Sequence, residues 1–215
     1  MKKIISIEGN IGSGKSTIIE RLKNSNLPFI YLPEPVDVWN EIKDSNGTTI
    51  LENYYNNIKR YSFSFQMMAY ITRLSQIRTQ LKNSPDDCII ITERCLYTDR
   101  FVFAKMLYDS GNIDNIEYSI YLKWFDEFID ILNPGNKFYV NKMIYIKTTP
   151  EICLERTKIR NRQGEQDMPL DYLTSCNNYH TDFINEVSIP KLILDGNEKI
   201  ELETIINFIN NTCIL

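Results

Sequence analysis

Five short apolar runs recur along the chain, each rich in β-branched or aromatic residues and bounded by turn or charged residues. They are KIISIE (3–8), FIYLPE (29–34), CIIITE (88–93), MIYIKT (143–148) and KLILDG (191–196). Such runs predict strands, and their near-continuous apolar character predicts burial on both faces, as in a parallel sheet. Helical patterns fill the intervals between them. The sequence therefore predicts one α/β domain over residues 1–215, with helices on both faces of the sheet.

The longest helical pattern runs from about Lys59 to Lys82. At about 100° per residue, one of its faces is apolar and we expect it to be core; it carries Phe63, Met67, Tyr70, Leu74, Ile77 and Leu81. Gln66, Ala69 and Arg73 follow one edge of that face and form a polar strip with room for a flat ligand. An amide and a guanidinium can both read the edge of a base. The polar boundary of an amphipathic helix is the alternative interpretation.

The segment ISIEGNIGSGKST (5–17) directly follows the first predicted strand and contains Gly-x-x-x-x-Gly-Lys-Ser. Glycines at this spacing let backbone N–H groups turn toward phosphate oxygens, and the helix that follows presents its positive end to them. The lysine adds a charge, and the serine hydroxyl can bind the Mg²⁺ that accompanies a nucleotide. The alternative is a glycine-rich turn without ligand. The predicted nucleotide-binding residues are Gly9, Asn10, Ile11, Gly12, Ser13, Gly14, Lys15, Ser16 and Thr17.

Charged residues follow the second and third predicted strands as well. Glu34 lies between two prolines, and Glu93-Arg94 follows the run CIIIT. Because ligands bind beyond the carboxyl ends of parallel strands, we expect these groups beside a bound γ-phosphate. Glu34 is a candidate base for a substrate hydroxyl, Glu93 a candidate acid near Mg²⁺, and Arg94 a bridge between phosphate and substrate. A solvated turn glutamate and a surface ion pair are the alternatives.

Arginines cluster in ERTKIRNRQGEQD (155–167). Arg156 and Arg160 are four residues apart on one predicted helix face, and Arg162 lies in a polar stretch that we expect to be a loop. A lid over about residues 156–168 would bring these charges to the phosphates of ATP. A solvated helix end is the alternative.

Composition limits the functional classes. Hydrophobic residues make up 43% of the chain, the formal net charge is −4, and no apolar run approaches the length of a membrane span. An acidic balance argues against a nucleic-acid polymer as partner. The number of cysteines, five, is odd, and no Cys-x-x-Cys occurs, so we expect neither a disulfide framework nor a zinc site. Free cysteines fit a reducing compartment, and we expect a cytoplasmic location. His180 is the single histidine, and we expect it at the surface or edge of a helix.

Taken together, these segments resemble the deoxynucleoside kinase family, and within it the deoxycytidine/deoxyguanosine kinase branch. The resemblance covers nearly the whole chain and is carried by IEGNIGSGKST, PEPVDVW, the FQ–x₆–R helix, ERCLYTDRFVFA, TPEICLERTKIRNRQGEQ and PLDYL. It implies a P-loop kinase fold with a five-stranded parallel sheet and an arginine-bearing lid. It also implies a homodimer and Mg²⁺-dependent transfer of the ATP γ-phosphate to the 5′-hydroxyl of a deoxynucleoside. The chain has no N-terminal extension, so we expect no organelle-targeted form.

The resemblance also implies roles for individual residues. Glu34 matches the residue that faces the 5′-hydroxyl, while Glu93 and Arg94 match the Glu-Arg pair near Mg²⁺ and the 5′ end; Lys15 completes the catalytic set and Ser16 the metal ligands. Tyr55 and Glu165 match residues that hold the 3′-hydroxyl; Gln66, Arg73 and Asp99 match the base-reading set; Trp39 and Phe103 match the walls around the base. The lid arginines match Arg156, Arg160 and Arg162, and Glu198, Lys199 and Ile200 match the loop near the ATP adenine.

Base preference follows from three positions. Thymidine-preferring members of the family look apolar at the two positions that Arg73 and Asp99 occupy in this chain. We expect Arg73 and Asp99 to pair and to read an amino-bearing base, with Ala69 leaving room for purines. Deoxycytidine, deoxyadenosine and deoxyguanosine are therefore expected substrates. The chain departs from the family at Cys95, where serine is usual, and a thiol is a weaker hydrogen-bond partner.

Four alternatives stay open: a thymidine-preferring deoxynucleoside kinase, a nucleoside monophosphate kinase, a nucleotide-switched module such as a GTPase, and a non-catalytic nucleotide-binding protein. A monophosphate kinase needs arginines around the acceptor phosphate, whereas Glu34 would repel it. A GTPase would carry Asn-Lys-x-Asp to read guanine, and the sequence contains no such segment.

Overall fold

Five parallel strands form one sheet in the order β2-β3-β1-β4-β5, as the apolar runs predict. The computed structural model describes residues 2–132, 139–166 and 168–211. The strands are β1 (Lys3–Gly9), β2 (Phe29–Leu32), β3 (Ile89–Glu93), β4 (Lys142–Lys147) and β5 (Lys191–Asp195). β1 lies at the centre, with Ile7 in register with Glu93 of β3 and Gly9 in register with Ile146 of β4. The carboxyl ends of these central strands therefore lie side by side.

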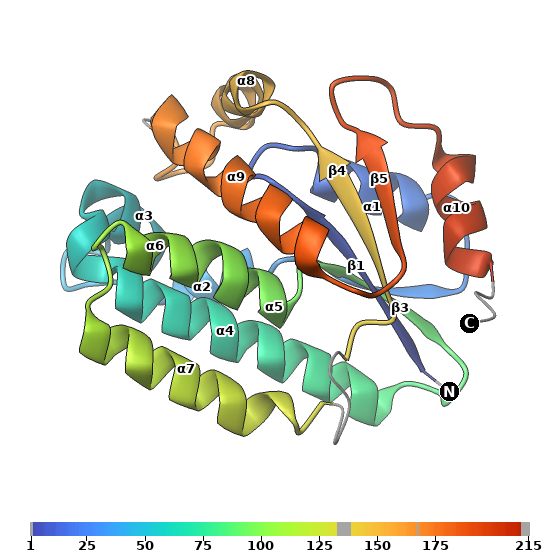
Figure 1. Cartoon of the computed structure of the whole chain (residues 1–215), viewed down its shortest axis with the longest axis horizontal. Helices are drawn as coiled ribbons and strands as arrows, with labels where there is room; N and C mark the ends of the chain where they lie inside the picture. Colours follow the sequence, from blue (N-terminus) through green and yellow to red (C-terminus); the bar gives the residue numbers. More distant parts are fainter. Residues whose placement is uncertain (1, 133–138, 167, 212–215) are drawn as a thin grey trace.

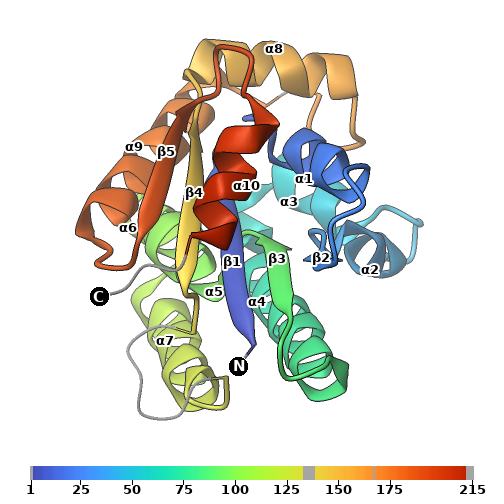
Figure 2. The same ribbon diagram turned by 90° about the vertical axis from the view of Figure 1, so that its right-hand side faces the viewer.

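Alternation along β1 divides the interior into two apolar layers. Ile5 and Ile7 point to the face covered by α1 (Lys15–Lys23) and α10 (Leu202–Asn210), whereas Ile4 points to the opposite face. Figure 2 shows α1 and α10 together on one side of the sheet, away from α4, α7 and α9. Burial on both faces explains why these strands read as continuous apolar runs.

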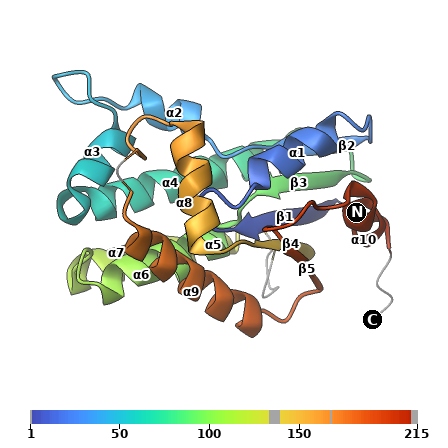
Figure 3. The same ribbon diagram turned by 90° about the horizontal axis from the view of Figure 1, so that it is seen from above.

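Most helices cover the second face and the carboxyl edge of the sheet. They are α2 (Val36–Glu41), α3 (Ile50–Asn56), α4 (Ile58–Asn83), α5 (Leu96–Thr98), the π-helical turn η1 (Asp99–Ala104), α6 (Lys105–Asp109), α7 (Asn115–Ile129), α8 (Pro150–Arg160) and α9 (Leu170–Glu186). In Figure 1, α7 lies alongside α4, and α9 crosses the sheet on the same side. Seen from above in Figure 3, α8 bridges between α1 and α9 at the edge where the site forms.

Local signals fix the helix ends near this edge. Thr49 and Glu52 form a reciprocal capping box at the start of α3. Asn57 caps α4 by accepting from the Arg60 N–H, and Pro150 occupies the first turn of α8, where its missing N–H costs nothing. These caps set where α3, α4 and α8 begin, and so aim their side chains at the carboxyl edge of the sheet.

Helix α4 extends one residue beyond the predicted Lys59–Lys82 at each end. Its predicted core face is buried at Tyr70, Leu74 and Ile77. The adjoining polar strip is buried too, with Gln66 3% and Arg73 2% exposed. The strip is therefore not a solvent-exposed boundary, because α4 is covered on two adjoining faces.

None of the helices in the described ranges combines the length and the apolar character needed to cross a membrane.

Candidate active site

The loop between β1 and α1 has the backbone that its glycines predict. Gly12 and Gly14 have φ angles of +77° and +100°, a region that glycine adopts at no steric cost. A Cβ atom on Gly12 would lie 2.4 Å from the Cys153 carbonyl oxygen, so no other residue fits there. The Lys15 Nζ donates to the Asn10 carbonyl at 2.8 Å and is nearly buried. Burial and the neighbouring Arg94 lower the pKa of Lys15 to about 8, although Glu93 and Glu34 oppose them.

Ser16 and Glu93 face each other across the end of β3. The Ser16 Oγ lies 3.1 Å from each carboxylate oxygen of Glu93, and the Lys15 Nζ lies 3.9 Å from the nearer one. The structure thus brings together a hydroxyl and a carboxylate from two strand ends. Hard oxygen donors of this kind suit Mg²⁺, which usually takes one or two protein ligands and completes its shell with water and phosphate.

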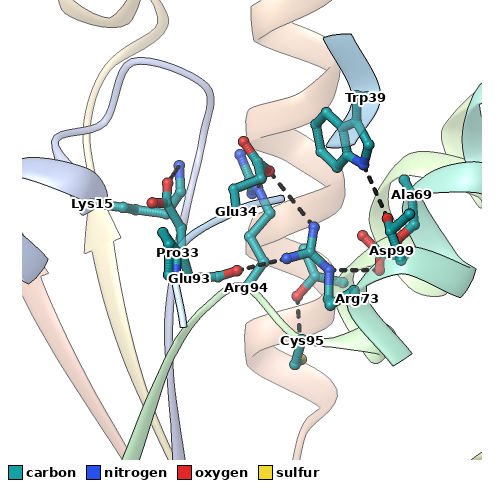
Figure 4. Close-up of polar contacts among 12 residues, drawn as sticks. Lys15, Pro33, Glu34, Trp39, Ala69, Arg73, Glu93, Arg94, Cys95 and Asp99 are labelled. Carbon is teal, nitrogen blue, oxygen red and sulfur yellow. Dashed lines mark hydrogen bonds and ion pairs between the residues drawn. The ribbon is translucent and has the colours of Figure 1, made fainter. Parts of the chain in front are cut away.

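Glu34 is surrounded by guanidinium groups from three different segments. Its Oε1 lies 3.3 Å from the Arg94 Nε and 3.6 Å from the Arg73 Nη2, and its Oε2 lies 3.8 Å from the Arg162 Nη1. Figure 4 shows Glu34 pointing from the end of β2 toward Arg73 and Arg94. The predicted alternative of a solvated turn glutamate is wrong, since only 17% of the side chain is exposed.

These cations determine the charge of Glu34. Burial alone would raise its pKa, but Arg94, Arg73, Lys15 and Arg162 together lower it to about 2. The carboxylate is therefore ionised throughout the neutral pH range. It can accept a hydrogen bond from a hydroxyl without first losing a proton of its own.

Arg94 reaches Glu34 from an unusual backbone conformation. Its φ angle is +67°, which is uncommon and costly for a residue other than glycine. The Nη1 donates to the Gly9 carbonyl at 2.7 Å, and the guanidinium lies 4.8 Å from the centroid of the Phe103 ring. The side chain, 3% exposed, thus links the phosphate-binding loop to Glu34 and is no surface ion pair.

Arg73 and Asp99 form the ion pair that the sequence predicts. The Arg73 Nε donates to the Asp99 Oδ2 at 2.8 Å, and its Nη1 donates to the Glu93 carbonyl at 2.7 Å. Burial raises the pKa of Asp99, while the Arg73 charge acts in the opposite direction. Asp99 and Phe103 both lie on η1, and the wider π-helical turn presents them to the same cavity; such turns occur often at functional sites.

One cavity collects all of these groups. It encloses about 600 Å³, including open solvent at its mouth. Every residue predicted to bind the substrate lines it: Glu34, Trp39, Tyr55, Gln66, Ala69, Arg73, Arg94, Asp99, Phe103 and Glu165. Ile11, Lys15, Glu93, Arg160 and Arg162 line it as well.

Four lining residues were given no role in the sequence analysis: Leu51, Tyr54, Phe65 and Tyr172, although Phe65 and Tyr172 lie in the quoted segments FQ–x₆–R and PLDYL. Phe65 packs edge-on against Trp39 with ring centroids 5.3 Å apart, and stacks on Tyr54 at 4.6 Å. Phe65 lies four and eight residues before Ala69 and Arg73, so helical spacing could have found it. Leu51 and Tyr54 carry no such signal.

A second cavity lies over the phosphate-binding loop. Its walls are Gly12, Gly14, Lys15, Ser16, Thr17, Arg156, Ile159 and Arg160. The Arg156 Nη1 donates to the Ser13 carbonyl at 3.3 Å, which fixes α8 against the loop. Lys15 and Arg160 line both cavities, so the two cavities adjoin at these side chains.

The remaining lid and loop residues lie as follows. Glu165 pairs with Arg160 and, at 3.3 Å, with Arg162. Asp167 of the predicted lid and Cys213 lie outside the described residues. Glu198 and Lys199 are exposed, and the Ile200 carbonyl accepts from Arg21 on α1 at 2.9 Å; the structure does not bring these three residues into the walls of either cavity.

Comparison with known proteins agrees with this geometry. A family model described as deoxynucleoside kinase matches residues 5–213. The chain belongs to the deoxynucleoside kinase family. It is 33% identical to deoxycytidine kinase 2 of Gallus gallus, over 90% of this chain and 82% of that protein, and 33% identical to deoxycytidine kinase of Homo sapiens, over 91% and 84%. It is also 30% identical to the mitochondrial deoxyguanosine kinase of Xenopus laevis, over 93% and 83%.

The fold is accordingly the P-loop kinase fold of this family, and two local details distinguish this deoxynucleoside kinase. The Cys95 Sγ lies 3.4 Å from the Thr98 Oγ1, and burial raises the pKa of the thiol well above its ordinary value. The thiol is therefore protonated in this contact. The expectation that His180 lies at a helix surface is wrong: the residue is fully buried and contacts Arg94, because α9 packs across the sheet.

The charge arrangement around Glu34 predicts a pH-dependent stability. Since the native environment lowers the Glu34 pKa from 4.5 to about 2, Glu34→Gln should destabilise the protein by up to about 3 kcal/mol at pH 7. This contribution is fully present above pH 4.5 and is lost as the pH falls toward 2. Urea unfolding at pH 7 and pH 3.5 measures it. Glu41→Gln, at an exposed position on α2, is the control. An equal difference at both pH values would contradict the assignment.

Proposed function

We propose that the protein transfers the γ-phosphate of ATP to the 5′-hydroxyl of a deoxynucleoside. The observation that carries this proposal is the meeting of two cavities at Lys15 and Arg160. The glycine-rich loop that lines one of them suits a triphosphate. The other is lined by Glu34, an ionised carboxylate that suits a hydroxyl and would repel a phosphorylated acceptor.

Glu34 is proposed as the base. A substrate hydroxyl in the cavity can donate a hydrogen bond to its carboxylate. As the hydroxyl oxygen bonds to the γ-phosphorus of ATP, the bond between that phosphorus and the β–γ bridging oxygen breaks, ADP leaves and the proton passes to Glu34. In a loose phosphoryl transfer the proton leaves late, so a carboxylate with a low pKa suffices. Arg94 holds the carboxylate by a 3.3 Å contact at the wall of the first cavity.

Lys15, Arg160 and Arg162 are proposed to neutralise charge on the transferred phosphoryl group. Mg²⁺ fits the hydroxyl and carboxylate oxygens of Ser16 and Glu93, which would hold it beside the phosphates. When bound there, the ion neutralises charge on the phosphate oxygens. Residues 156–168 are proposed as a lid within a single domain, with Arg156 anchoring its first turn to the loop carbonyl of Ser13.

Gln66, Arg73 and Asp99 support a preference for an amino-bearing base. No hydrogen bond joins the Gln66 amide to another described residue, so its donor and acceptor are available to a ligand. Asp99 can accept from an exocyclic amino group beside Arg73. The 4-carbonyl of thymine would instead face the carboxylate and be repelled. Ala69, on the same helix face, leaves space for a purine. The relatives named as deoxycytidine and deoxyguanosine kinases agree with this preference.

We propose a homodimer formed through α7. Ile116, Ile120 and Trp124 recur every four residues on this helix and are 73%, 41% and 44% exposed. Large apolar side chains aligned on one exposed face are typical of a surface that another protein covers. A cytosolic location stays a prediction from the sequence.

The substrate class is tested by phosphoryl transfer from ATP to deoxycytidine, deoxyadenosine, deoxyguanosine, thymidine and thymidine monophosphate. We expect the three amino-bearing nucleosides to be phosphorylated with higher kcat/KM than thymidine. Arg73→Met with Asp99→Ala should raise the ratio of thymidine to deoxycytidine kcat/KM at least about tenfold. Arg78→Met, at an exposed position on the same helix, is the control. Preference for thymidine or its monophosphate in the unaltered protein would contradict the proposal.

The oligomeric state is tested by sedimentation velocity. Trp124→Glu should convert the protein from dimer to monomer, because it buries a charge in the apolar face of α7. Asn178→Glu adds the same charge on α9, away from this face, and should leave the dimer intact. A monomeric unaltered protein, or a dimer in the Trp124→Glu variant, would overturn the assignment.

A further inference from the structure

His180 is buried in the middle of α9, and its ring contacts the side chain of Arg94. It is 0% exposed, and its Nε2 lies 3.2 Å from the Arg94 Nη1. Phe103 packs edge-on against the ring with centroids 5.8 Å apart, and Tyr145 of β4 lies at 6.1 Å in a stacked arrangement. Aromatic rings on two sides thus fix the plane of the imidazole.

The position of the proton on the His180 ring follows from its contact with Arg94. A guanidinium can only donate, so the Nε2 must accept from Arg94. Burial, Arg94 and Lys15 lower the pKa of His180 well below its ordinary value of 6.5, and the ring is neutral. Its one proton therefore lies on Nδ1, which finds no hydrogen-bond partner among the described residues. A buried donor without a partner is destabilising, so stability does not account for a histidine here.

The contact completes the set of acceptors around Arg94. Its Nη1 donates to the Gly9 carbonyl at 2.7 Å and to His180, and its Nε donates to Glu34 at 3.3 Å. These acceptors come from the end of β1, from α9 and from the segment after β2. Three acceptors in fixed directions leave the planar guanidinium one orientation. That orientation places the Nε toward Glu34.

We propose that His180 is a positioning residue for phosphoryl transfer, whose Nε2 holds the Arg94 guanidinium in the orientation that aims Glu34 at the acceptor hydroxyl. The role rests on the proposed function of Glu34 and Arg94. The rate of transfer depends steeply on how accurately the reacting atoms are placed. Loss of this acceptor therefore lowers the rate of transfer more than it weakens the binding of either substrate.

Glutamine and methionine provide a matched pair of substitutions. Both have the length to place a terminal atom near the Nε2 position, but only the glutamine amide oxygen is a strong acceptor. We expect His180→Met to lower kcat about 10–100-fold, with the KM of the nucleoside and of ATP within about threefold. His180→Gln should retain kcat within about threefold of the unaltered protein. Tyr179→Phe removes a hydrogen bond to Asp109 from the same helix, away from the site, and should leave kcat unchanged.

Equal losses of kcat in the two variants, or no loss in either, would overturn the proposal. A KM increase as large as the kcat decrease would also overturn it, since that outcome assigns the residue to substrate binding. If the unaltered protein transfers no phosphate to any nucleoside, the proposed function fails instead.

The imidazole can also be observed without any substitution. His180 is the single histidine, so ¹⁵N-detected ring signals of the labelled protein belong to it alone. Between pH 6 and 8 we expect one neutral ring with its proton on Nδ1 and an unprotonated, hydrogen-bonded Nε2. A ring protonated on Nε2, or a charged ring, would exclude the contact with Arg94 and overturn the proposal even if the methionine variant fails to fold.

Discussion

The structure of the site depends on a single carboxylate placed among guanidinium groups at the carboxyl edge of the sheet. Arg73 and Arg94 are 2% and 3% exposed, and buried cations are tolerated only with anionic partners. Glu34 serves both of them and Arg162 as well. Asp99 is the other partner of Arg73, and Glu165 the other partner of Arg162. Glu34 therefore links the long helix α4, the end of β3 and the lid segment into one charge network.

The same charge network affects both the stability of the fold and the chemistry of the site. The charges that keep Glu34 ionised are those that a phosphoryl acceptor site needs around a developing negative charge. Arg94 joins this network from a backbone with a positive φ angle, and the contacts of its side chain with the Gly9 carbonyl and His180 help to hold that conformation. An ionised carboxylate, a nearly buried lysine and a hydroxyl–carboxylate pair thus lie together where two cavities meet. The arrangement is preorganised because these groups are held from the carboxyl ends of three neighbouring strands, β1, β2 and β3.

The residues at the carboxyl edge of the sheet could be predicted from the sequence because the apolar strand runs and the glycine-rich loop are local signals. The five apolar runs located the strands, and the segments around the ends of three of them supplied Lys15, Glu34 and Arg94. Contacts between distant segments were less accessible. The stretch TSCNNYHTD around His180 is polar, so no periodic pattern of apolar residues predicted that His180 is buried. It is buried because α9 crosses the sheet. Tyr172 and Leu51 likewise reach the cavity through tertiary packing, whereas Arg73 and Asp99 were paired through the resemblance to a family.

The rate of transfer in a Glu34→Gln variant tests the central claim most directly. Single-turnover phosphorylation of deoxycytidine by ATP would be compared with nucleoside affinity in the unaltered protein, in Glu34→Gln and in the exposed control Glu41→Gln. The amide keeps the shape of the side chain but cannot take a proton, so the transfer rate should fall at least about 100-fold while nucleoside affinity stays within about threefold. A loss of rate smaller than about tenfold would contradict the role of Glu34 as the base.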